Sequence, residues 1–398
     1  MTNTVRIGMN GSMLDEHPTG VGIYSVNIIN HLSFLYKDEK NRAITVFTPT
    51  NTLLNKDIKT IHLSRLLKSS QYGKLAAFTR FMWNTFYYPI QARKFDLLIS
   101  TTTHGSFFSA NQIITIHDLL SLRFNNISAH QRIYYKYLLP YMVSKAKLII
   151  AVSETTKKDI IQFLNIPENK IKVVYNGYDE ETYNNIPLLH KYIFDKYAVE
   201  NYFLAVGPTY PHKNFELLLG AYNELDITIK ELHPLVIAGG KKEYLNKLKS
   251  YVLENNLQKY VQFIGYVPAE LMAPLYKEAF ALIFPSLFEG FGFPLLEAMA
   301  SGCPVLASDV SSIPEVCEDA VLYFDPYHKS SLLLQLNKIS TDSLLQDQLK
   351  KKGLEQAKKF SWIKTVQQLK KIVEETIAHK PIKNFNHDKH KLLHSYLS

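Results

Sequence analysis

Short apolar runs, rich in β-branched residues and bounded by polar turns, recur along the chain with longer helix-compatible stretches between them. In the first half these runs are residues 5–12, 43–49, 96–102, 112–119, 147–153 and 170–177. A second series comprises residues 202–208, 235–240, 261–267, 281–287, 304–310 and 320–326. Strands that are apolar almost throughout and alternate with helices are typical of a parallel sheet covered on both faces. The sequence therefore predicts an α/β protein with two doubly wound, Rossmann-like domains.

The join between the two domains is expected between Asp179 and about Asn201, where polar and aromatic residues follow one another without clear periodicity. With 398 residues, of which 46% are hydrophobic, the chain is long enough for about two domains. We expect residues 1–185 to form the first domain and residues 186–365 the second. Ligands of open α/β sheets bind at the carboxyl ends of the strands, so two facing sheets predict a cleft between the domains.

The cysteines and the apolar stretches bear on the cellular compartment. Only Cys303 and Cys317 are present, and the N-terminal residues show no basic region followed by a long apolar run. No apolar stretch approaches the roughly 20 residues of a membrane span. We therefore expect a cytoplasmic protein without a disulfide, attached to a membrane at most peripherally.

The formal net charge of +9 comes from the first half of the chain. Residues 1–198 hold 23 Lys and Arg against 14 Asp and Glu, whereas residues 199–398 hold 22 of each. Such a charge favours an anionic partner, which could be nucleic acid, a phospholipid surface or a phosphorylated substrate. A basic surface that only keeps the protein soluble is the alternative.

A glycine-rich turn follows one of the apolar runs in residues 288–305, FEGFGFPLLEAMASGCPV. Pro294 is favoured at the start of a helix, and Gly302 with Pro304 is a typical helix end. The stretch therefore predicts a buried strand, a turn and a short helix.

Two acidic residues flank this turn. Gly290 and Gly292 would let the backbone approach a ligand closely, and the N–H groups of the first helical turn favour a phosphate. Glu289 follows the strand, and Glu297 is expected in the first turn of the helix. Because carboxylates repel phosphate, we expect both to accept hydrogen bonds from sugar hydroxyls on either side of it. The alternative is that Glu297 only stabilises its helix end and Glu289 is solvated.

The pair Glu289 and Glu297, with seven residues between them, resembles the signature of the family-4 retaining glycosyltransferases, which have the GT-B fold. Further blocks resemble that family in the expected order, at residues 19–29, 115–122, 151–160, 173–179, 206–214, 263–267 and 360–369. The resemblance implies that the first domain takes the acceptor and the second the nucleotide sugar. It also implies that residues 366–398 comprise a helix returning to the first domain and a tail.

The resemblance assigns roles to several residues near the predicted strand ends. Lys213 is expected to neutralise the diphosphate leaving group. His212 stands where the family often has an arginine and is a weaker cation at neutral pH, so either Lys213 bears most of the charge or another basic residue helps. His117 is expected to face the donor sugar and to hydrogen-bond a hydroxyl, while Asp118 orients the loop.

The implied catalytic residues are His117, Lys213 and Glu289. The implied donor-binding residues are Gly20, Gly22, His212, Lys213, Glu289, Gly290, Phe291, Gly292 and Glu297. Gly20 and Gly22 belong to a loop that would approach the donor from the first domain, although such a glycine pair is more often a plain turn.

The reaction that the resemblance implies transfers a mannose- or glucose-type hexose from a donor such as GDP-mannose or a UDP-hexose to an acceptor hydroxyl. It proceeds with retention, by front-face displacement. No cofactor is expected beyond the nucleotide sugar as co-substrate. The sequence contains no Asp-x-Asp, the usual metal clamp, so we expect metal-independent chemistry. His387, His390 and His394 could share a helix face around a metal, but tails of this composition are more often disordered.

Acceptor recognition is expected in the basic half. Residues 74–94 and 131–147 combine Lys and Arg with many aromatic residues. They could lie on an anionic membrane surface and meet a lipid-linked saccharide or a growing surface polysaccharide such as lipopolysaccharide. The alternative, which we favour for most of the following residues, is that they are core positions of amphipathic helices: Trp83, Phe86, Tyr135 and Tyr137.

Three rival functions are weighed against this one. A GT-B-shaped sugar-nucleotide epimerase would share the donor site but need no acceptor. A basic nucleic-acid-binding protein would show salt-sensitive oligonucleotide affinity, yet no nucleic-acid motif is present and the acids of the cleft oppose it. A Rossmann dehydrogenase lacks its glycine fingerprint after the first strand.

Overall fold

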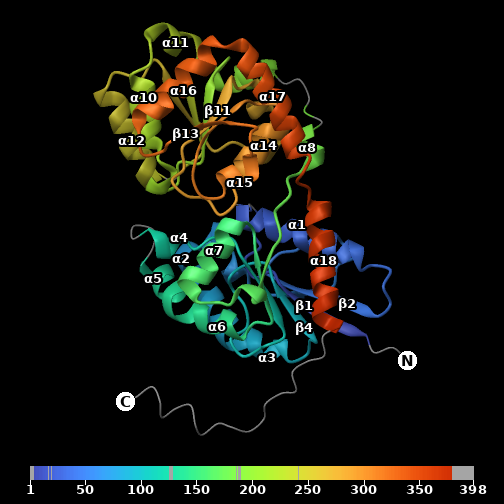
Figure 1. The fold of residues 1–398 in the computed structure, drawn as a ribbon. Coiled ribbons are helices and arrows are strands. Elements are labelled where there is room, and N and C mark those ends of the chain that lie inside the picture. The colour runs from blue at the N-terminus through green and yellow to red at the C-terminus, as the bar shows by residue number, and fades with distance from the viewer. Residues whose placement is uncertain are drawn as a thin grey trace.

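The computed structural model describes residues 4–16, 18, 20–124, 129–184, 186, 190–240 and 242–378. These residues form two α/β domains, each built around one parallel sheet with helices on both of its faces (Figure 1). The two domains face each other, and the chain crosses between them again near its C-terminus (Figure 1). The predicted architecture of two doubly wound domains is confirmed.

The first sheet has seven parallel strands in the order β3-β2-β1-β4-β5-β6-β7. The strands are β1 (Val5–Asn10), β2 (Arg42–Thr48), β3 (Thr60–His62), β4 (Leu97–Ser100), β5 (Gln112–Ile116), β6 (Leu148–Ala151) and β7 (Ile171–Val173). β4 and β5 are buried along their whole length, which is why most of their residues are apolar. β3 was not predicted from the sequence, because this short edge strand is partly exposed and has no apolar run.

The helices of the first domain are α1 (Gly20–Leu35), α2 (Ser69–Met82), α3 (Tyr88–Ala92), α4 (Leu120–Arg123), α5 (Ala129–Ile133), α6 (Leu139–Lys145) and α7 (Glu154–Leu164). π-Helical turns join α2 to α3 at Trp83–Tyr87 and α5 to α6 at Tyr134–Leu138. A proline follows each turn closely, Pro89 in α3 and Pro140 in α6. Proline has no N–H, and its ring clashes with the carbonyl four residues earlier, so the helix widens at these points.

The second sheet has six parallel strands in the order β10-β9-β8-β11-β12-β13. The strands are β8 (Phe203–Val206), β9 (Leu235–Ala238), β10 (Val261–Gly265), β11 (Ala281–Phe284), β12 (Val305–Ser308) and β13 (Leu322–Phe324). Successive residues of β8 enter opposite cores: Phe203 packs in one cluster with Phe215 and Leu248, and Leu204 packs in the other with Leu275 and Leu295. This alternation explains why the strand is apolar at every position.

The helices of the second domain are α8 (Glu180–Asn184), α9 (His190–Tyr197), α10 (Phe215–Asn223), α11 (Ile227–Leu232), α12 (Lys242–Glu254), α13 (Ala269–Glu278), α14 (Phe293–Ala300), α15 (Ile313–Cys317), α16 (Lys329–Thr341) and α17 (Ser343–Ala357). Because Tyr183 packs in the core of the second domain, α8 belongs to that domain and the first domain ends before the expected residue 185. None of the helices in the described ranges combines the length and the apolar character that crossing a bilayer requires.

The last described helix, α18 (Trp362–Ala378), lies against the first domain beside α1 (Figure 1). Its buried face, which includes Trp362 and Val366, packs into the core around Ile7 and Tyr24. Where the chain returns to the first domain, it passes very close to Gly177, which follows β7. A Cβ on Gly177 would lie 2.1 Å from the backbone nitrogen of Trp362. Trp362 therefore already belongs to the first domain's core, ahead of the expected boundary at residue 366.

Replacing Trp362 by alanine should destabilise the first domain by about 3–5 kcal/mol, because the indole ring is 4% exposed and fills that core. Urea unfolding followed by the fluorescence of Trp83 measures the effect, since the chain has two tryptophans and Trp83 packs in the first domain. The control is Ile363→Ala on the same helix, where the side chain is 54% exposed and the change should stay within about 0.5 kcal/mol. Equal midpoints for the two variants would show that α18 does not stabilise the domain.

Candidate active site

A cavity of about 320 Å³ lies between the two domains, at the carboxyl ends of their strands. Eight of the residues predicted from the sequence line it: Gly20, His117, Lys213, Glu289, Gly290, Phe291, Gly292 and Glu297. Gly22 and His212 do not line it. Gly20 and Gly22 belong to the first turn of α1 and not to a loop, so Gly20 brings the helix N-terminus to the cavity.

The glycine turn of the second domain rests on the first domain at Gly290. A Cβ atom on Gly290 would lie 2.0 Å from the carbonyl oxygen of His117, so no other residue fits without moving the domains apart. The hydroxyl of Ser153 donates to the carbonyl of Gly290 at 2.7 Å. Thr156 Oγ1 lies 3.1 Å from the carbonyl oxygen of His117 and 3.3 Å from that of Gly290. The sequence predicted that Gly290 lets the backbone approach a ligand. The contact that requires a glycine at this position in the structure is the one with His117 of the first domain.

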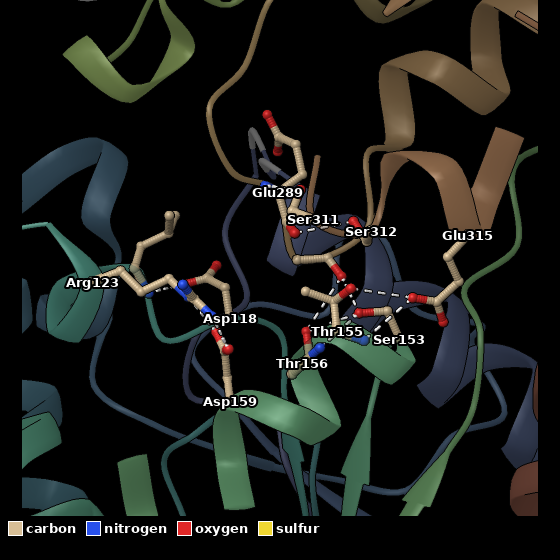
Figure 2. A network of polar contacts seen from close by, with 12 residues as sticks. Asp118, Arg123, Ser153, Thr155, Thr156, Asp159, Glu289, Ser311, Ser312 and Glu315 are labelled. Atoms are coloured by element: carbon tan, nitrogen blue, oxygen red, sulfur yellow. Dashed lines mark hydrogen bonds and ion pairs between the residues drawn. The ribbon is translucent and has the colours of Figure 1, made fainter. Parts of the chain in front are cut away.

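The N-terminus of α7 makes the second contact across the cleft, with Glu315 of α15 (Figure 2). The carboxylate of Glu315 accepts hydrogen bonds from the backbone N–H of Glu154 at 2.5 Å and of Thr155 at 3.3 Å. The first N–H groups of a helix have no partner within the helix, and a carboxylate at this end also suits the helix dipole. Glu315 of the second domain therefore completes a helix end of the first.

Serines 311 and 312 hold the backbone on either side of Glu289. The N–H of Glu289 donates to Ser311 Oγ at 3.0 Å, and Ser312 Oγ donates to the carbonyl of Glu289 at the same distance (Figure 2). Ser312 Oγ also lies 3.2 Å from the carbonyl oxygen of Phe291. These bonds fix the turn that carries Glu289, so the direction of its side chain depends on residues some twenty positions further along the chain.

Lys213 and Glu289 form an ion pair inside the cavity. Lys213 Nζ lies 2.6 Å from Glu289 Oε1, and the two side chains are 20% and 12% exposed. The predicted phosphate-binding cation and the predicted sugar-binding carboxylate thus neutralise each other. A diphosphate that reaches Lys213 must compete with Glu289 for it.

Glu297 is the fifth residue of α14 and not part of its first turn, which contains no acidic residue. The prediction that it lies in the first turn is therefore wrong, because the helix begins at Phe293, one residue before the proline. Burial raises the pKa of Glu297 to about 7, and the repulsion of Asp179 acts in the same direction. Hydrogen bonds from Tyr276 and Tyr183 lower that pKa in part, and Tyr276 Oη lies 3.1 Å from Glu297 Oε2. Glu297 is therefore a carboxyl group that changes charge near neutral pH.

His117 is a neutral group in the cavity wall. Burial lowers its pKa to about 4, and Nε2 lies 2.9 Å from the carbonyl oxygen of Thr101. Because a carbonyl only accepts, Nε2 carries the proton and Nδ1 is the accepting nitrogen. Asp118 accepts a hydrogen bond from the N–H of Leu120 at 3.1 Å, which fixes the start of α4.

His212 is 5% exposed and stacks between Phe124 and Tyr210. Burial, and secondarily the charge of Lys213, lower the pKa of His212 to about 4. It is therefore neutral at physiological pH and adds no positive charge to the site. Of the two neighbours considered as phosphate ligands, Lys213 is the one that brings a charge to the cavity.

Asn176 also lines the cavity and was not named as a site residue. It is 1% exposed, and its Oδ1 has no hydrogen-bond partner among the described residues. Asn176 lies in residues 173–179, one of the blocks that resemble the family, and this resemblance could have identified it as a site residue. Glu315 was missed because the residues that it contacts lie far away in the sequence.

The structure does not locate a metal. Within the ranges described above, no group of three or more His, Cys, Asp or Glu side chains could hold a metal ion. The predicted cluster of His387, His390 and His394 lies outside the described residues.

Comparisons with known proteins agree with this geometry. The profile of the family described as "Glycosyltransferase Family 4" matches residues 20–182, and that of "Glycosyl transferases group 1" matches residues 190–356. The O-antigen chain mannosyltransferase RfbU of Salmonella typhimurium is 33% identical over 234 residues, 59% of this chain and 62% of that protein. The chain thus matches less than two thirds of that relative's length.

Two further similarities extend over nearly the whole chain. The O-antigen chain mannosyltransferase B of Escherichia coli is 28% identical over 367 residues, which are 86% of this chain and 93% of that protein. The crystal structure of Anabaena HepE with UDP and glucose superposes with a TM-score of 0.72 at 18% identity, covering 93% of this chain and 99% of that one. The chain belongs to glycosyltransferase family 4 and has the GT-B fold.

Proposed function

We propose that this glycosyltransferase moves a hexose from a nucleoside diphosphate sugar to an acceptor hydroxyl, with retention at the anomeric carbon and without a metal ion. The observation that carries the proposal is the cavity between the domains, where Lys213 and Glu289 lie beside the glycine turn and Glu297 lies beyond it. The names of the Salmonella and E. coli relatives support mannose as the sugar, and hence GDP-mannose as the donor. They also support a lipid-linked or growing surface polysaccharide as the acceptor. We place the reaction at the cytoplasmic face of the membrane.

Four side chains of the cavity have a part in this reaction: Lys213, Glu289, Glu297 and His117. Lys213 leaves Glu289 and pairs with the diphosphate, whose departure it assists by neutralising negative charge. The released carboxylate of Glu289 accepts a hydrogen bond from a hydroxyl of the donor sugar. Ionised Glu297 accepts from the ribose hydroxyls. His117 accepts a sugar hydroxyl at Nδ1, because its neutral form leaves that nitrogen unprotonated.

Retention follows from attack on the face that the diphosphate leaves. The bond between the acceptor oxygen and the anomeric carbon forms while the bond from that carbon to the phosphate oxygen breaks. The acceptor's proton passes to the departing phosphate oxygen. Glu289 is held by Lys213 before the donor binds and by the sugar afterwards, so it is assigned to binding and not to attack as a nucleophile.

Glu289→Gln and Glu297→Gln separate the two glutamates. Glu297→Gln should weaken the binding of free nucleoside diphosphate by roughly 10- to 150-fold, since a hydrogen bond to a charged group contributes about 1.5–3 kcal/mol. Glu289→Gln should bind nucleoside diphosphate at least as tightly as the parent protein, because Lys213 loses its competitor, but should transfer sugar 10- to 150-fold more slowly. Calorimetry with GDP and UDP, beside initial rates with the matching donor, gives both numbers.

The control for this pair is Glu270→Gln, an exposed carboxylate at the start of α13, which should change neither quantity. Normal nucleotide binding and normal transfer in both variants would mean that the two carboxylates are structural, and the proposed function would fail.

Tyr276→Phe should shift the pH dependence of nucleotide binding upward by about one unit, because it removes a hydrogen bond that lowers the pKa of Glu297. The ribose hydroxyls donate to the ionised carboxylate, so affinity rises with pH through about 7 in the parent protein. In the variant it should be weaker at pH 7 and recover at higher pH. Tyr202→Phe is the control, since that buried hydroxyl donates to the carbonyl of Leu275 and not to Glu297. Coinciding pH profiles in the parent protein and both variants would contradict the assignment.

Metal independence is tested by removing divalent ions. Transfer should persist in EDTA, because Lys213 and the helix N-termini at the cavity supply the positive charge that a metal clamp would otherwise bring. Rates are measured with EDTA and with added magnesium or manganese. Activity that vanishes in EDTA and returns only with a divalent ion would contradict the proposed arrangement.

A further inference from the structure

A row of large apolar side chains lies exposed along α2, the following π-helical turn and α3. The row consists of Leu75, Phe78, Met82, Phe86 and Ile90, which are 52%, 62%, 40%, 59% and 57% exposed. They follow one another at three or four residues, the spacing of neighbours on one side of a helix. We call this row the apolar ridge. It is not the core-facing side of the segment, because Trp83 and Tyr88 stack together against Phe47 in the core.

The second aromatic segment has a smaller exposed row, at Ile133, Tyr137 and Tyr141. The Nζ atoms of Lys136 and Lys145 lie 5.2 Å and 3.9 Å from the ring centres of Tyr137 and Tyr141. The expectation that most of the aromatic residues are core positions holds for Trp83 and Tyr135, which pack against buried clusters. It is wrong for Phe86 and Tyr137, which are 59% and 62% exposed.

The two segments that carry the rows contain basic residues and no acidic ones, although Lys68 and Arg80 of the first segment are buried. Residues 58–95 contain seven Lys and Arg and no Asp or Glu, and residues 119–153 contain five and none. Arg93 and Lys94 are exposed just beyond the end of the ridge, and Arg132 is exposed beside the second row. An anionic surface therefore meets no carboxylate from either segment that would repel it.

Both segments are tied to the wall of the cavity through residues 101–108. The amide of Asn10 bridges Asn84 of the first π-helical turn and the carbonyl of His104, both at 2.7 Å. From the second segment, Tyr134 donates to the carbonyl of Thr103 at 2.9 Å. The same stretch includes Thr101, whose carbonyl accepts from His117. A surface that bound these helices would thus keep the first-domain side of the cleft at a fixed distance from that surface.

We propose that the apolar ridge and the second row seat the first domain on an anionic phospholipid bilayer. The apolar side chains enter the boundary between headgroups and acyl chains, and exposed basic residues, among them Arg93, Lys94 and Arg132, contact lipid phosphates. A lipid bilayer fits both the exposed apolar side chains and the basic residues of the two segments. A second copy of the chain would bring two cationic surfaces together, and the aliphatic members of the ridge offer no stacking face to a nucleic-acid base. The role of this surface in acceptor capture rests on the proposed function, but its binding to lipid does not.

The test is flotation of the full chain with vesicles of phosphatidylcholine alone and with equal parts of phosphatidylglycerol. Binding should require phosphatidylglycerol and should fall steeply between about 0.05 and 0.5 M salt as screening increases. The double variant Phe78→Ser with Phe86→Ser should lose at least tenfold in vesicle affinity. The matched control is Leu334→Ser with Leu344→Ser, which removes two side chains of the second domain that are 64% and 74% exposed.

Nucleoside diphosphate binding by calorimetry separates this inference from the proposed function, because the ridge does not line the cavity. The Phe78→Ser, Phe86→Ser variant should keep that affinity, which also shows that it is folded. Vesicle binding that is equal in the ridge variant and its control would overturn the docking proposal while leaving the proposed function untouched. Self-association or oligonucleotide binding that the ridge variant alone abolishes, without lipid binding by the parent protein, would also overturn it.

Discussion

The contact of Gly290 with the carbonyl of His117 decides how the two domains sit relative to each other. It is a backbone-to-backbone approach, and a Cβ on Gly290 would come within 2.0 Å of that oxygen. The hydroxyls of Ser153 and Thr156 bond the same turn from the N-terminus of α7, and Glu315 completes that helix end from the opposite domain. The turn that carries Glu289 is therefore positioned by the first domain as much as by its own strand. Because residues of both domains line the cavity, its shape depends on this contact between the domains.

The ionisable side chains of the cavity are paired with one another or shifted toward their neutral form by burial. Lys213 is neutralised by Glu289, Glu297 is a carboxyl group whose pKa lies at about 7, and His117 and His212 are neutral because they are buried. A ligand that brings its own negative charge and hydroxyl groups can replace the partners that these residues now have. Under the proposed function, the donor would take over these hydrogen bonds without meeting a fixed excess of positive charge in the cavity. The basic residues that make up the net charge lie elsewhere, in the two acid-free segments of the first domain.

Elements with strong local signals could be predicted, and elements defined by their partners could not. The apolar runs predicted twelve of the strands in order, because a buried parallel strand is apolar at nearly every position. β3 escaped because an exposed edge strand has no such run. Eight of the predicted site residues lie around one cavity. The place of Glu297 within α14, the burial of His212 and the exposure of Phe86 and Tyr137 could not be read from residue types, since each depends on what packs against the side chain.

By itself the sequence determined the two parallel sheets, the strand ends at which the cavity lies, the family to which the chain belongs and the concentration of positive charge in the first half. These follow from patterns that repeat along the chain or from residue types at set spacings, and neither needs knowledge of distant contacts. Only the tertiary structure decided that Gly290 serves the domain contact, that Lys213 is paired with Glu289, that Tyr276 bonds Glu297 and that the apolar ridge faces outward. The physical reason is that protonation, pairing and exposure depend on neighbours in space, and those neighbours come from segments tens to hundreds of residues apart.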